Sequence, residues 1–379
     1  MSAVRQVLIV GGGIGGLTLA IALKRQGIEA EIVESNPAWS VYGVGIIQPS
    51  NMLRALAQIG LGESCLALGF GFPGWRIHDA RGTPLAEVPN TNVAPAGYPP
   101  INGITRPALH KILTEATLSQ GTRVHLGVTL RDYQDNERGI VARFSDGRTG
   151  GYDLIIGADG AHSTLRTRLF GPSPRAQLTG QSVWRYNLNR PRDLTWGCLY
   201  YGSRSKAGLV PLAHDLMYLL LVTMEPGPAR MPQDALHQLL RERLSEYGGL
   251  IADLRAQITD PSGVVYRPME AVLVPAPWHR GRVILIGDAA HAGTPHLAQG
   301  AAMAIEDAVV LADLLGRSVD LSSTLDHFVA RRFPRCELVM NVGLKLGEWE
   351  AAEWRGQPAP DTDHGGLLQQ TLTTLMQPM

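Results

Sequence analysis

The sequence predicts an α/β fold in which a parallel sheet with helices is interrupted by a mostly antiparallel sheet. A short apolar run at residues 7–10 leads into the glycine-rich segment 11–16, and a helical pattern follows. Residues 177–268 instead carry short aromatic and aliphatic runs, which are typical of antiparallel strands. Apolar runs at 153–156 and 283–286 lie on either side of that segment. We therefore expect the first domain to be interrupted and then to resume.

The first domain begins with a predicted strand–helix–strand unit. Its strands are residues 7–10 and 31–34, and its helix is residues 17–26, which ends at Gly27. A helix at 106–119 is supported by Pro107 in its first turn and Gly121 after its end. Further strands are predicted at 124–126, 140–144, 153–156 and 283–286, and further helices at 163–170, 300–315 and 321–342.

The middle of the chain predicts a second sheet. Its strands are expected at 182–188, 197–201, 209–212 and 216–224, followed by a helix at 235–247. We therefore expect a discontinuous first domain (1–72, 101–176 and 269–345), an inserted sheet domain (73–100 and 177–268) and a C-terminal tail (346–379).

Composition limits the classes of partner. The 379 residues include 34 basic and 34 acidic side chains, and this balance argues against nucleic acid or an anionic membrane as the main partner. The three cysteines have no metal-like spacing, so we expect reduced thiols, no metal and a cytoplasmic protein. The apolar start is broken by glycines, which argues against a signal peptide. We expect a monomer or homodimer acting on a small molecule.

The glycine-rich segment predicts a Rossmann-like dinucleotide site. Gly11, Gly13 and Gly16 follow a strand and open a helix, where glycines permit a tight turn and close approach of the backbone to a pyrophosphate. The helix N-terminus offers N–H groups to phosphates. Glu34 ends the next strand, where a carboxylate can accept from ribose hydroxyls. This segment alone does not distinguish NAD from FAD.

Two later motifs make that distinction. Residues 153–166, around Gly157-Ala158-Asp159-Gly160, and residues 287–308, around Gly287-Asp288-Ala289-Ala290-His291, follow in the same order as motifs of a known family. With the first motif, they resemble the fingerprints of class A flavoprotein monooxygenases, the para-hydroxybenzoate hydroxylase family. The resemblance covers residues 4 to about 340, and it is greatest to compact salicylate, hydroxynicotinate and urate hydroxylases.

The resemblance implies FAD as cofactor and a set of residues that bind it. Asp288 is expected to accept from the ribityl chain, and the helix beginning near Gly300 to direct N–H groups at the flavin, where they stabilise its reduced anion. Asp159 also fits a helix cap. Two positions depart from the family pattern: Ala302 replaces a common Asn or Cys, and Ser35 a common Arg. The expected cofactor residues are Gly11, Gly13, Ile14, Gly15, Gly16, Glu34, Arg106, Leu130, Asp159, Gly160, Gly287, Asp288, Gln299, Gly300, Ala301 and Ala302.

The resemblance also implies an activity. Such an enzyme takes electrons transiently from NAD(P)H, uses O2 as co-substrate and hydroxylates a small phenolic or hydroxylated N-heteroaromatic acid through a flavin C4a-hydroperoxide. The site must exclude water.

Candidate substrate residues rest on chemistry and position. His296, after Pro295, is the candidate base, although a structural loop histidine fits equally well. Gln48, expected in the loop after residues 43–45, is a candidate substrate contact, as are Arg185, Lys206 and Tyr218. Lys206 also fits a solvated loop and Tyr218 a sheet core. Trp184 and Arg185 alternate along a strand, so only one can face the pocket. His162 and His291 are expected to be structural.

Other activities remain open on the same fold. A reductase or epoxidase of an isoprenoid-like substrate would favour a long apolar tunnel, and a non-catalytic flavin-binding regulator would retain FAD without substrate-stimulated NAD(P)H oxidation. Halogenases share the first motif, but their Trp-x-Trp-x-Ile-Pro signature is absent from this sequence.

Overall fold

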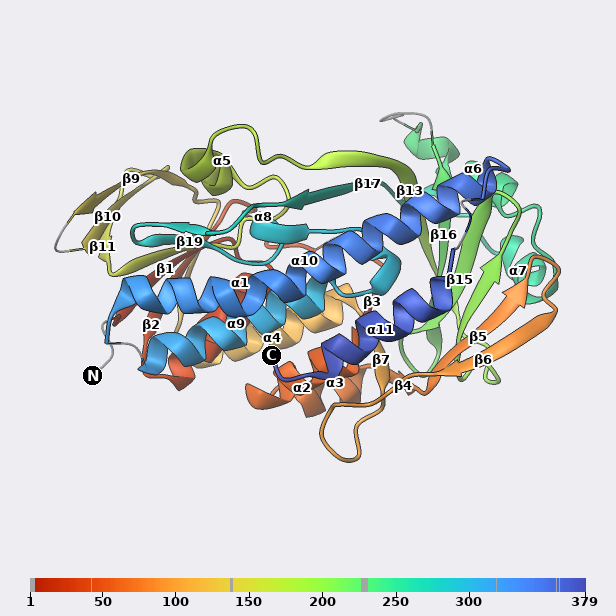
Figure 1. Cartoon of the computed structure of the whole chain (residues 1–379), viewed down its shortest axis with the longest axis horizontal. Helices are drawn as coiled ribbons and strands as arrows, with labels where there is room; N and C mark the ends of the chain where they lie inside the picture. The colour runs from red at the N-terminus through yellow and green to blue at the C-terminus, as the bar shows by residue number, and fades with distance from the viewer. Residues whose placement is uncertain are drawn as a thin grey trace.

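A computed structural model describes residues 4–41, 43–136, 139–225, 231–317, 319–358, 360 and 362–379. Two large sheets lie toward opposite ends of the molecule, and a long C-terminal helix runs along both (Figure 1). Each sheet has its own main hydrophobic cluster. The predicted α/β class, with an inserted antiparallel sheet and C-terminal helices, is confirmed.

The first large sheet places the three sequence motifs side by side. Val10 pairs with Gly157 and Gly157 with Leu285, all in parallel, so the chain leaves three adjacent strands at the same edge. Ligands of open parallel sheets bind at the carboxyl ends of the strands. Only the edge strand β18 is antiparallel among the described strands of this sheet. In order across the sheet, the strands are β18 (His279–Arg280), β19 (Val283–Leu285), β12 (Leu154–Gly157), β1 (Gln6–Val10), β2 (Glu29–Glu34) and β8 (Arg123–Leu126).

Helices and a small sheet complete this domain. Helix α1 (Ile14–Arg25) packs against α4 (Arg106–Ser119) and α9 (Gly300–Arg317), and α4 has the predicted bounds. Helix α1 begins three residues before the predicted start because the glycines at 15 and 16 belong to its first turn. The small sheet consists of β9 (Leu130–Asn136), β10 (Gly139–Phe144) and β11 (Thr149–Tyr152), and its buried side chains join the core of the large sheet.

The second large sheet is antiparallel except between β14 and β5. Trp184 is fully buried beneath the helices on one face, so Arg185 faces the other way, as the alternation predicts. The predicted helix at 235–247 is shorter than expected, because the chain turns before Gly249, which has φ +56°. The strands are β17 (Val265–Leu273), β13 (Gln177–Asn189), β16 (Leu216–Met224), β15 (Ser205–Pro211), β14 (Gly197–Tyr201), β5 (Gly74–Asp79) and β6 (Pro84–Pro89); the helices are η1 (Gln233–Ala235), α6 (Leu236–Arg243), α7 (Gly249–Arg255) and η2 (Pro261–Gly263).

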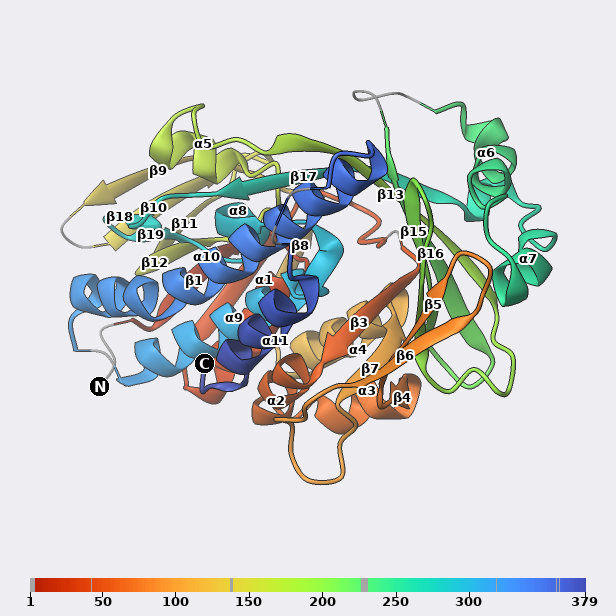
Figure 2. The same cartoon turned by 45° about the vertical axis from the view of Figure 1, so that its right-hand side comes forward.

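A third sheet, which the sequence analysis missed, lies between the two large ones (Figure 2). Its strands β3 (Gly45–Pro49), β7 (Ile101–Thr105) and β4 (Phe70–Phe72) pair antiparallel, and α2 (Ser50–Gln58) and α3 (Gly62–Leu68) pack beside them. Strand β3 brings its first residue against the second sheet: a Cβ at Gly45 would lie 2.8 Å from Tyr218 Cε1. This contact requires glycine.

The C-terminal helices are longer and more closely attached than expected. Helix α10 (Leu321–Trp354) continues through the boundary that we expected at residue 345, and it contacts α9, β13 and β17. Arg335 on α10 donates to the carbonyls of Thr374 and Leu375, which end helix α11 (His364–Met376). No helix in the described part of the chain is both long and apolar enough to cross a membrane. The remaining short helices are α5 (Thr164–Phe170), α8 (Asp288–His291) and η3 (Pro295–Leu297).

Candidate active site

The glycine loop after β1 forms a cradle that fits a pyrophosphate. Gly11 has φ +111°, and a Cβ there would lie 2.6 Å from the carbonyl carbon of Ala158. A Cβ at Gly13, in contrast, would meet nothing within 4 Å. The loop is therefore closed on its protein side and open at Gly13, beside the N-terminus of α1 where N–H groups attract phosphate. Ile14 and Gly15 form the first residues of that helix.

Glu34 is fixed at the end of β2 beside this cradle. Its Oε2 accepts the backbone N–H of Gly12 at 2.8 Å, and its Oε1 accepts that of Asn36 at 2.7 Å. Trp39, which has φ +47°, donates Nε1–H to the Gly12 carbonyl at 3.0 Å. Carboxylate oxygens have further lone pairs, so a ribose hydroxyl can still be accepted. Leu130 is buried at the start of β9, and its carbonyl accepts from Arg168 at 3.3 Å.

The Asp159-Gly160 turn after β12 starts the next helix. Asp159 Oδ2 accepts the backbone N–H groups of Thr164 (2.9 Å) and Leu165 (3.1 Å), and Oδ1 accepts from Ser163 Oγ (2.6 Å). The N-cap residue of α5 (Thr164–Phe170) is Ser163, so the expectation that Asp159 is the N-cap is wrong, although Asp159 accepts the first two N–H groups of that helix. Gly160 has φ +80° and open space beside it. Direct cofactor contacts of both residues stay predictions.

The loop after β19 presents Asp288. Gly287 has φ +58°, and its N–H donates to Asp307 Oδ2 on α9 at 2.9 Å. The Asp288 side chain is exposed to solvent, yet desolvation raises its pKa against the opposing effects of His291 and Arg106. We take these two observations together as the signature of a carboxylate inside a deep recess, where protein surrounds it without covering it.

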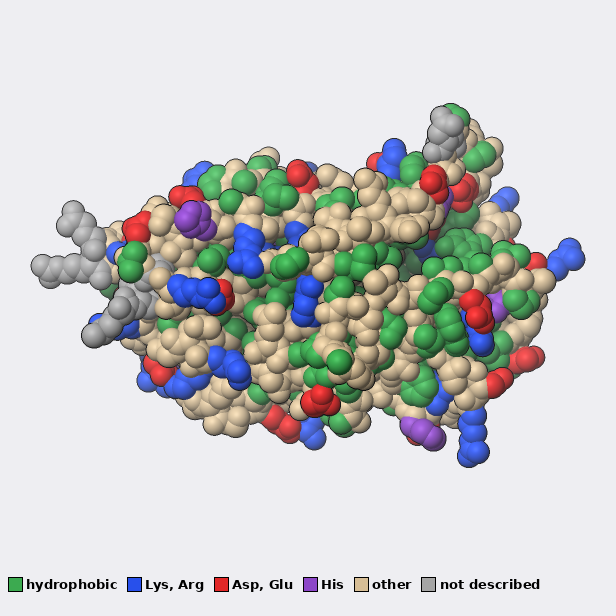
Figure 3. Space-filling model, turned by 60° about the horizontal axis from the view of Figure 1, so that its bottom comes forward, with side chains coloured by type: hydrophobic (Ala, Val, Ile, Leu, Met, Phe, Trp, Pro, Cys, Tyr) green, Lys and Arg blue, Asp and Glu red, His purple; other side chains and the backbone are tan. Residues whose placement is uncertain are grey.

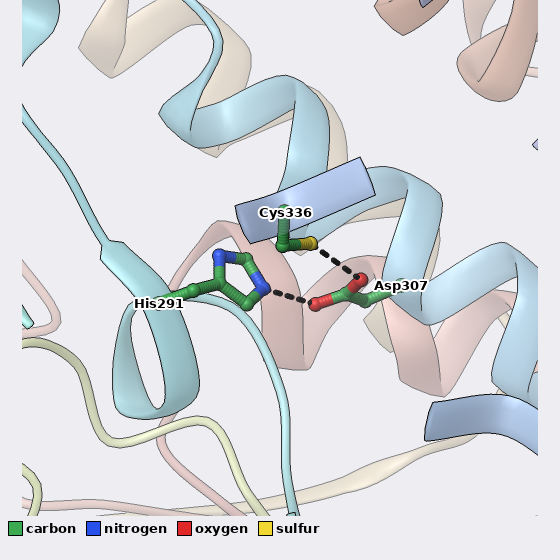
Figure 4. A group of neighbouring side chains, drawn as sticks. All are labelled: His291, Asp307 and Cys336. Atoms are coloured by element: carbon green, nitrogen blue, oxygen red, sulfur yellow. Dashed lines mark hydrogen bonds and ion pairs between the residues drawn. The ribbon is translucent and has the colours of Figure 1, made fainter. Parts of the chain in front are cut away.

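A buried ionic network holds that loop. His291 Nε2 lies 2.7 Å from Asp307 Oδ2, and Cys336 Sγ lies 3.9 Å from Oδ1 (Figure 4). Arg332 Nε also donates to Asp307 Oδ1 at 2.7 Å. Burial opposes ionisation of Asp307, but His291 and Arg332 outweigh it and lower its pKa to about 2.

The ligating atoms of His291, Asp307 and Cys336 lie close enough together to suggest a metal site. However, both Asp307 oxygens already face positively charged or N–H donor groups, and the Arg332 guanidinium would repel a cation. We therefore interpret the network as structural. The sequence analysis missed Arg332 and Arg335, although two arginines three residues apart can share one helix face and pair with adjacent acids such as Glu306 and Asp307.

The N-terminus of α9 opens toward the same edge. Gly300 is exposed, and a Cβ there would meet nothing within 4 Å. Ala301 is half-buried and Ala302 fully buried in the first turn. Gln299 turns inward, where its side chain pairs with Asn51 of α2 at 3.0 Å. Open backbone at the start of an 18-residue helix suits a group that gains negative charge.

Arg106 lies within electrostatic range of Asp288 and also of Arg185 and Tyr218. Burial lowers the pKa of Arg185 and raises that of Tyr218, and Arg106 acts electrostatically on both and on Asp288. A Cβ at Gly43, which has φ +142°, would lie 3.3 Å from Arg106 Cβ, so glycine gives that arginine its place. The half-buried Arg185 has no hydrogen-bond or ion-pair partner among the described residues. The molecular surface is hollowed between its two parts, with hydrophobic side chains along the hollow (Figure 3).

His296 and Lys206, far apart in sequence, meet through a residue that the sequence analysis missed. Glu350 of α10 forms an ion pair with Lys206 through Oε1, and its Oε2 lies 3.2 Å from His296 Nε2. His296 Nδ1 lies 2.8 Å from Thr294 Oγ1. Burial opposes ionisation of Glu350, but Lys206 and His296 lower its pKa to about 2. No sequence motif marks Glu350, because it follows the recognised motifs by many residues on what was expected to be a tail.

Gln48 and Pro295 complete the predicted set. Gln48 was expected in a loop, and this is wrong, because it lies on β3, fully buried. Its Oε1 accepts from Asn102 at 2.7 Å, and its Nε2 has no partner within the described chain. Pro295 begins η3 and leads directly into His296.

Comparison with known proteins agrees with this geometry. Residues 5–342 match a family model described as an FAD binding domain. The chain is 34% identical to aurachin C monooxygenase/isomerase of Stigmatella aurantiaca, over 91% of this chain and 90% of that protein. It is 31% identical to 3-amino-4-hydroxybenzoate 2-monooxygenase PtnB3 of Streptomyces platensis, over 90% and 87%.

The fold is shared with a solved structure. Klebsiella pneumoniae HpxO complexed with FAD and uric acid superposes with a TM-score of 0.86 at 23% identity, covering 99% of this chain and 98% of that one. The cradle at Gly13, the recessed Asp288 and the open start of α9 fit FAD. The chain belongs to the FAD-dependent monooxygenases of the class A flavoprotein hydroxylase family.

Proposed function

We propose that this enzyme hydroxylates a small phenolic or hydroxylated N-heteroaromatic acid, with NAD(P)H as electron donor and O2 as co-substrate. The relatives support an aromatic substrate, since their names refer to aurachin C and 3-amino-4-hydroxybenzoate. HpxO, which shares the fold, was solved with uric acid.

The environment of Arg185 is the observation that supports an acidic substrate. Arg185 is half-buried, close to Tyr218, and has no partner among the described residues. A desolvated guanidinium without a counter-charge is costly, and a carboxylate or ring oxyanion bound there would supply that charge with bidentate geometry. Arg106 adds a second positive charge nearby. The recess therefore favours an anionic ring over a neutral isoprenoid chain.

The protein's own contribution is to bind, orient and exclude water. Bound FAD supplies the electron transfer and the activation of O2. The glycine cradle and α1 would hold its pyrophosphate, Glu34 its ribose, Asp288 its ribityl chain and the start of α9 its pyrimidine end. Tyr218, which is buried in a hydrophobic cluster, is proposed to pack against the substrate ring. Asp159, Gly160, Leu130 and Gln299 are proposed to assist mainly through backbone or loop geometry.

His296 is proposed as the group that finally takes up the proton of the substrate hydroxyl, through intervening groups, because an electron-rich ring that has lost this proton reacts faster with an electrophilic oxygen. Pro295 fixes its backbone at the start of η3. Lys206 supports the charge balance around His296 through Glu350. Gln48, with an unpaired buried amide N–H, is proposed as a nearby polar contact.

The test begins with purified protein and a panel of phenolic and heteroaromatic acids. We expect bound FAD, NAD(P)H oxidation stimulated by one class of acid, and a product heavier by one oxygen atom. Stimulation that yields only hydrogen peroxide would identify an effector. Bound FAD without any stimulation would favour a non-catalytic flavin protein.

Arg185→Gln tests the proposal that Arg185 binds the negative charge of the substrate. We expect KM for an acidic substrate to rise by roughly 10- to 100-fold, the equivalent of about 1.5–3 kcal/mol for a hydrogen bond to a charged group. The matched control is Arg267→Gln, which removes an exposed arginine from the neighbouring strand β17. If the two variants behaved alike, the proposed role of Arg185 would be wrong.

A further inference from the structure

Both ring nitrogens of His296 are already engaged. Nε2 lies 3.2 Å from Glu350 Oε2, and Nδ1 lies 2.8 Å from Thr294 Oγ1, while the side chain is 1% exposed. A base in this position cannot accept a proton directly from a substrate, because each nitrogen faces another protein group. Any proton must arrive or leave through one of those two groups.

The chemistry of Glu350 decides which nitrogen carries the proton. An ionised carboxylate only accepts hydrogen bonds, so His296 Nε2 must be the donor toward it. In neutral imidazole the other nitrogen is then an acceptor. Nδ1 therefore accepts the hydroxyl proton of Thr294 in a hydrogen bond.

The charges around Glu350 favour its ionised form. Lys206 of β15 pairs with Oε1, and Gln181 Nε2 of β13 donates to Oε2 at 3.4 Å. Tyr201 of β14 lies within electrostatic range of Lys206, Glu350 and Glu353. Of these, Lys206 is the cation in direct contact, so it supplies the counter-charge that keeps a carboxylate stable in a buried place.

Small residues on α10 make this arrangement possible. A Cβ at Gly347 would lie 3.2 Å from His296 Cε1, and a Cβ at Gly343 would lie 2.8 Å from Thr294 Oγ1. Helix α10 thus lies close against η3, and its Glu350 contacts His296 Nε2, the ring nitrogen that does not face Thr294. Thr294 also lines a cavity of about 440 Å³ between α10 and strands β13 and β17, which contains space for water.

We propose that Glu350 is a positioning residue that confines the exchangeable proton of His296 to Nδ1, and that Thr294 passes this proton between His296 and water in the adjoining cavity. The proposal rests on the proposed function of His296 and extends it to a relay of Glu350, His296 and Thr294. For uptake, water in the cavity gives a proton to Thr294 Oγ, and the Thr294 hydroxyl proton passes to Nδ1. For release, Thr294 Oγ accepts the Nδ1 proton and gives its own hydroxyl proton to water. One proton crosses, and no electrons move.

Nitrogen-15 NMR of histidine-labelled holoenzyme tests the relay without any substrate. His296 signals are assigned by their loss in His296→Gln. We expect the neutral ring to be protonated at Nε2, and Glu350→Gln to lose this preference, because a neutral amide no longer requires Nε2 to be the donor. The control Glu348→Gln removes an exposed carboxylate from the same helix and should leave the protonated nitrogen of His296 unchanged.

Two further variants keep the test sharp. Lys206→Met combined with Glu350→Gln removes both buried charges, so it guards against misfolding caused by an unpaired lysine. Thr294→Val keeps the shape but removes the hydroxyl, and it should reduce kcat about 10-fold with little change in KM.

A neutral ring protonated at Nδ1, or the same protonated nitrogen in Glu350→Gln and Glu348→Gln, would overturn the proposal. So would unchanged kcat and an unchanged pH profile in Thr294→Val. If no aromatic acid is hydroxylated at all, the proposed function fails, but the NMR result still decides the arrangement of Glu350 and His296.

Discussion

The backbone N–H of Gly287 donates to Oδ2 of Asp307 at 2.9 Å, so helix α9 holds the loop that presents Asp288. The same carboxylate pairs with His291 and Arg332. One buried side chain thus joins the loop, α8, α9 and α10. The recess for the flavin depends on a charge network that does not itself need to touch the flavin.

Asp307→Asn should therefore weaken both stability and FAD binding. Loss of the charge leaves Arg332 and the protonated His291 with reduced compensation, and breaking such a buried pair costs about 3–5 kcal/mol. Urea unfolding measured with and without FAD should show the loss in both forms. Asp313→Asn, which removes a partly exposed carboxylate from the same helix, should change stability little. Equal effects of the two substitutions would contradict this role.

Gly13→Ala should separate cofactor binding from folding. The new methyl group would meet no protein atom within 4 Å, but it would enter the space that fits the pyrophosphate. We expect FAD affinity to fall about 10-fold or more, equivalent to about 1.4 kcal/mol, with unchanged stability of the apoprotein. Flavin fluorescence titration measures the affinity.

Gly151→Ala, on β11 and also with open space around its Cβ, is the control and should bind FAD normally. Gly11→Ala should fail differently, because its φ of +111° and the nearby Ala158 carbonyl make the folded loop itself unfavourable. Normal FAD binding by Gly13→Ala would show that the cradle lies elsewhere.

Stability should fall in acid as two buried carboxylates become protonated. The pKa values of Glu350 and Asp307 are each lowered to about 2, so their contribution is complete above their unfolded values near 4 and is lost as pH falls toward 2. Each contributes on the order of 2–3 kcal/mol. Urea unfolding between pH 6 and 2.5 should show the decline, with a shallower slope in the Lys206→Met/Glu350→Gln double variant. A slope unchanged by that substitution would contradict the assignment.

The cysteines should be silent toward thiol reagents in the folded protein. All three are buried, and burial raises the pKa values of Cys65 and Cys198 to about 11. At pH 8 the thiolate fraction is then small and inaccessible. Ellman's reagent should react slowly with native protein and with three thiols after denaturation. Rapid native labelling of any one cysteine would be inconsistent with this packing.

Much of the fold could be predicted because many helices and strands are determined by local sequence features, such as glycine positions and apolar runs. The strand–helix unit around Gly11 and the helix Arg106–Ser119 both follow from neighbouring residues. The sheet containing β3 was missed because its strands pair with distant partners, and Gln48 was consequently expected in a loop. The helix predicted at 235–247 was too long, because the sequence does not show that the chain turns before Gly249, whose φ is +56°.

Site residues could be predicted where they belong to a sequence motif. They could not be predicted where folding brings together charged residues that are distant in the sequence. Asp288 and Gly300 belong to motifs, whereas Glu350 has meaning only beside Lys206 and His296. Sequence spacing does not show that contact, because its members come from a strand, a short 3₁₀ turn and a terminal helix. The link between His296 and Lys206 through Glu350 therefore became visible only in the structure.

Helix α10 spans 34 residues, or about 50 Å, and it carries Arg332 in its N-terminal half and Glu350 near its C-terminal end. The same helix therefore contacts both the network that holds the flavin loop and the His296 site. A substitution that tilts α10 at one of these two contacts would also move the helix at the other. Variants of this helix that are made to broaden the range of substrates should thus be screened for weakened FAD binding. Where FAD binding is weakened, a compensating substitution at the other contact should restore it.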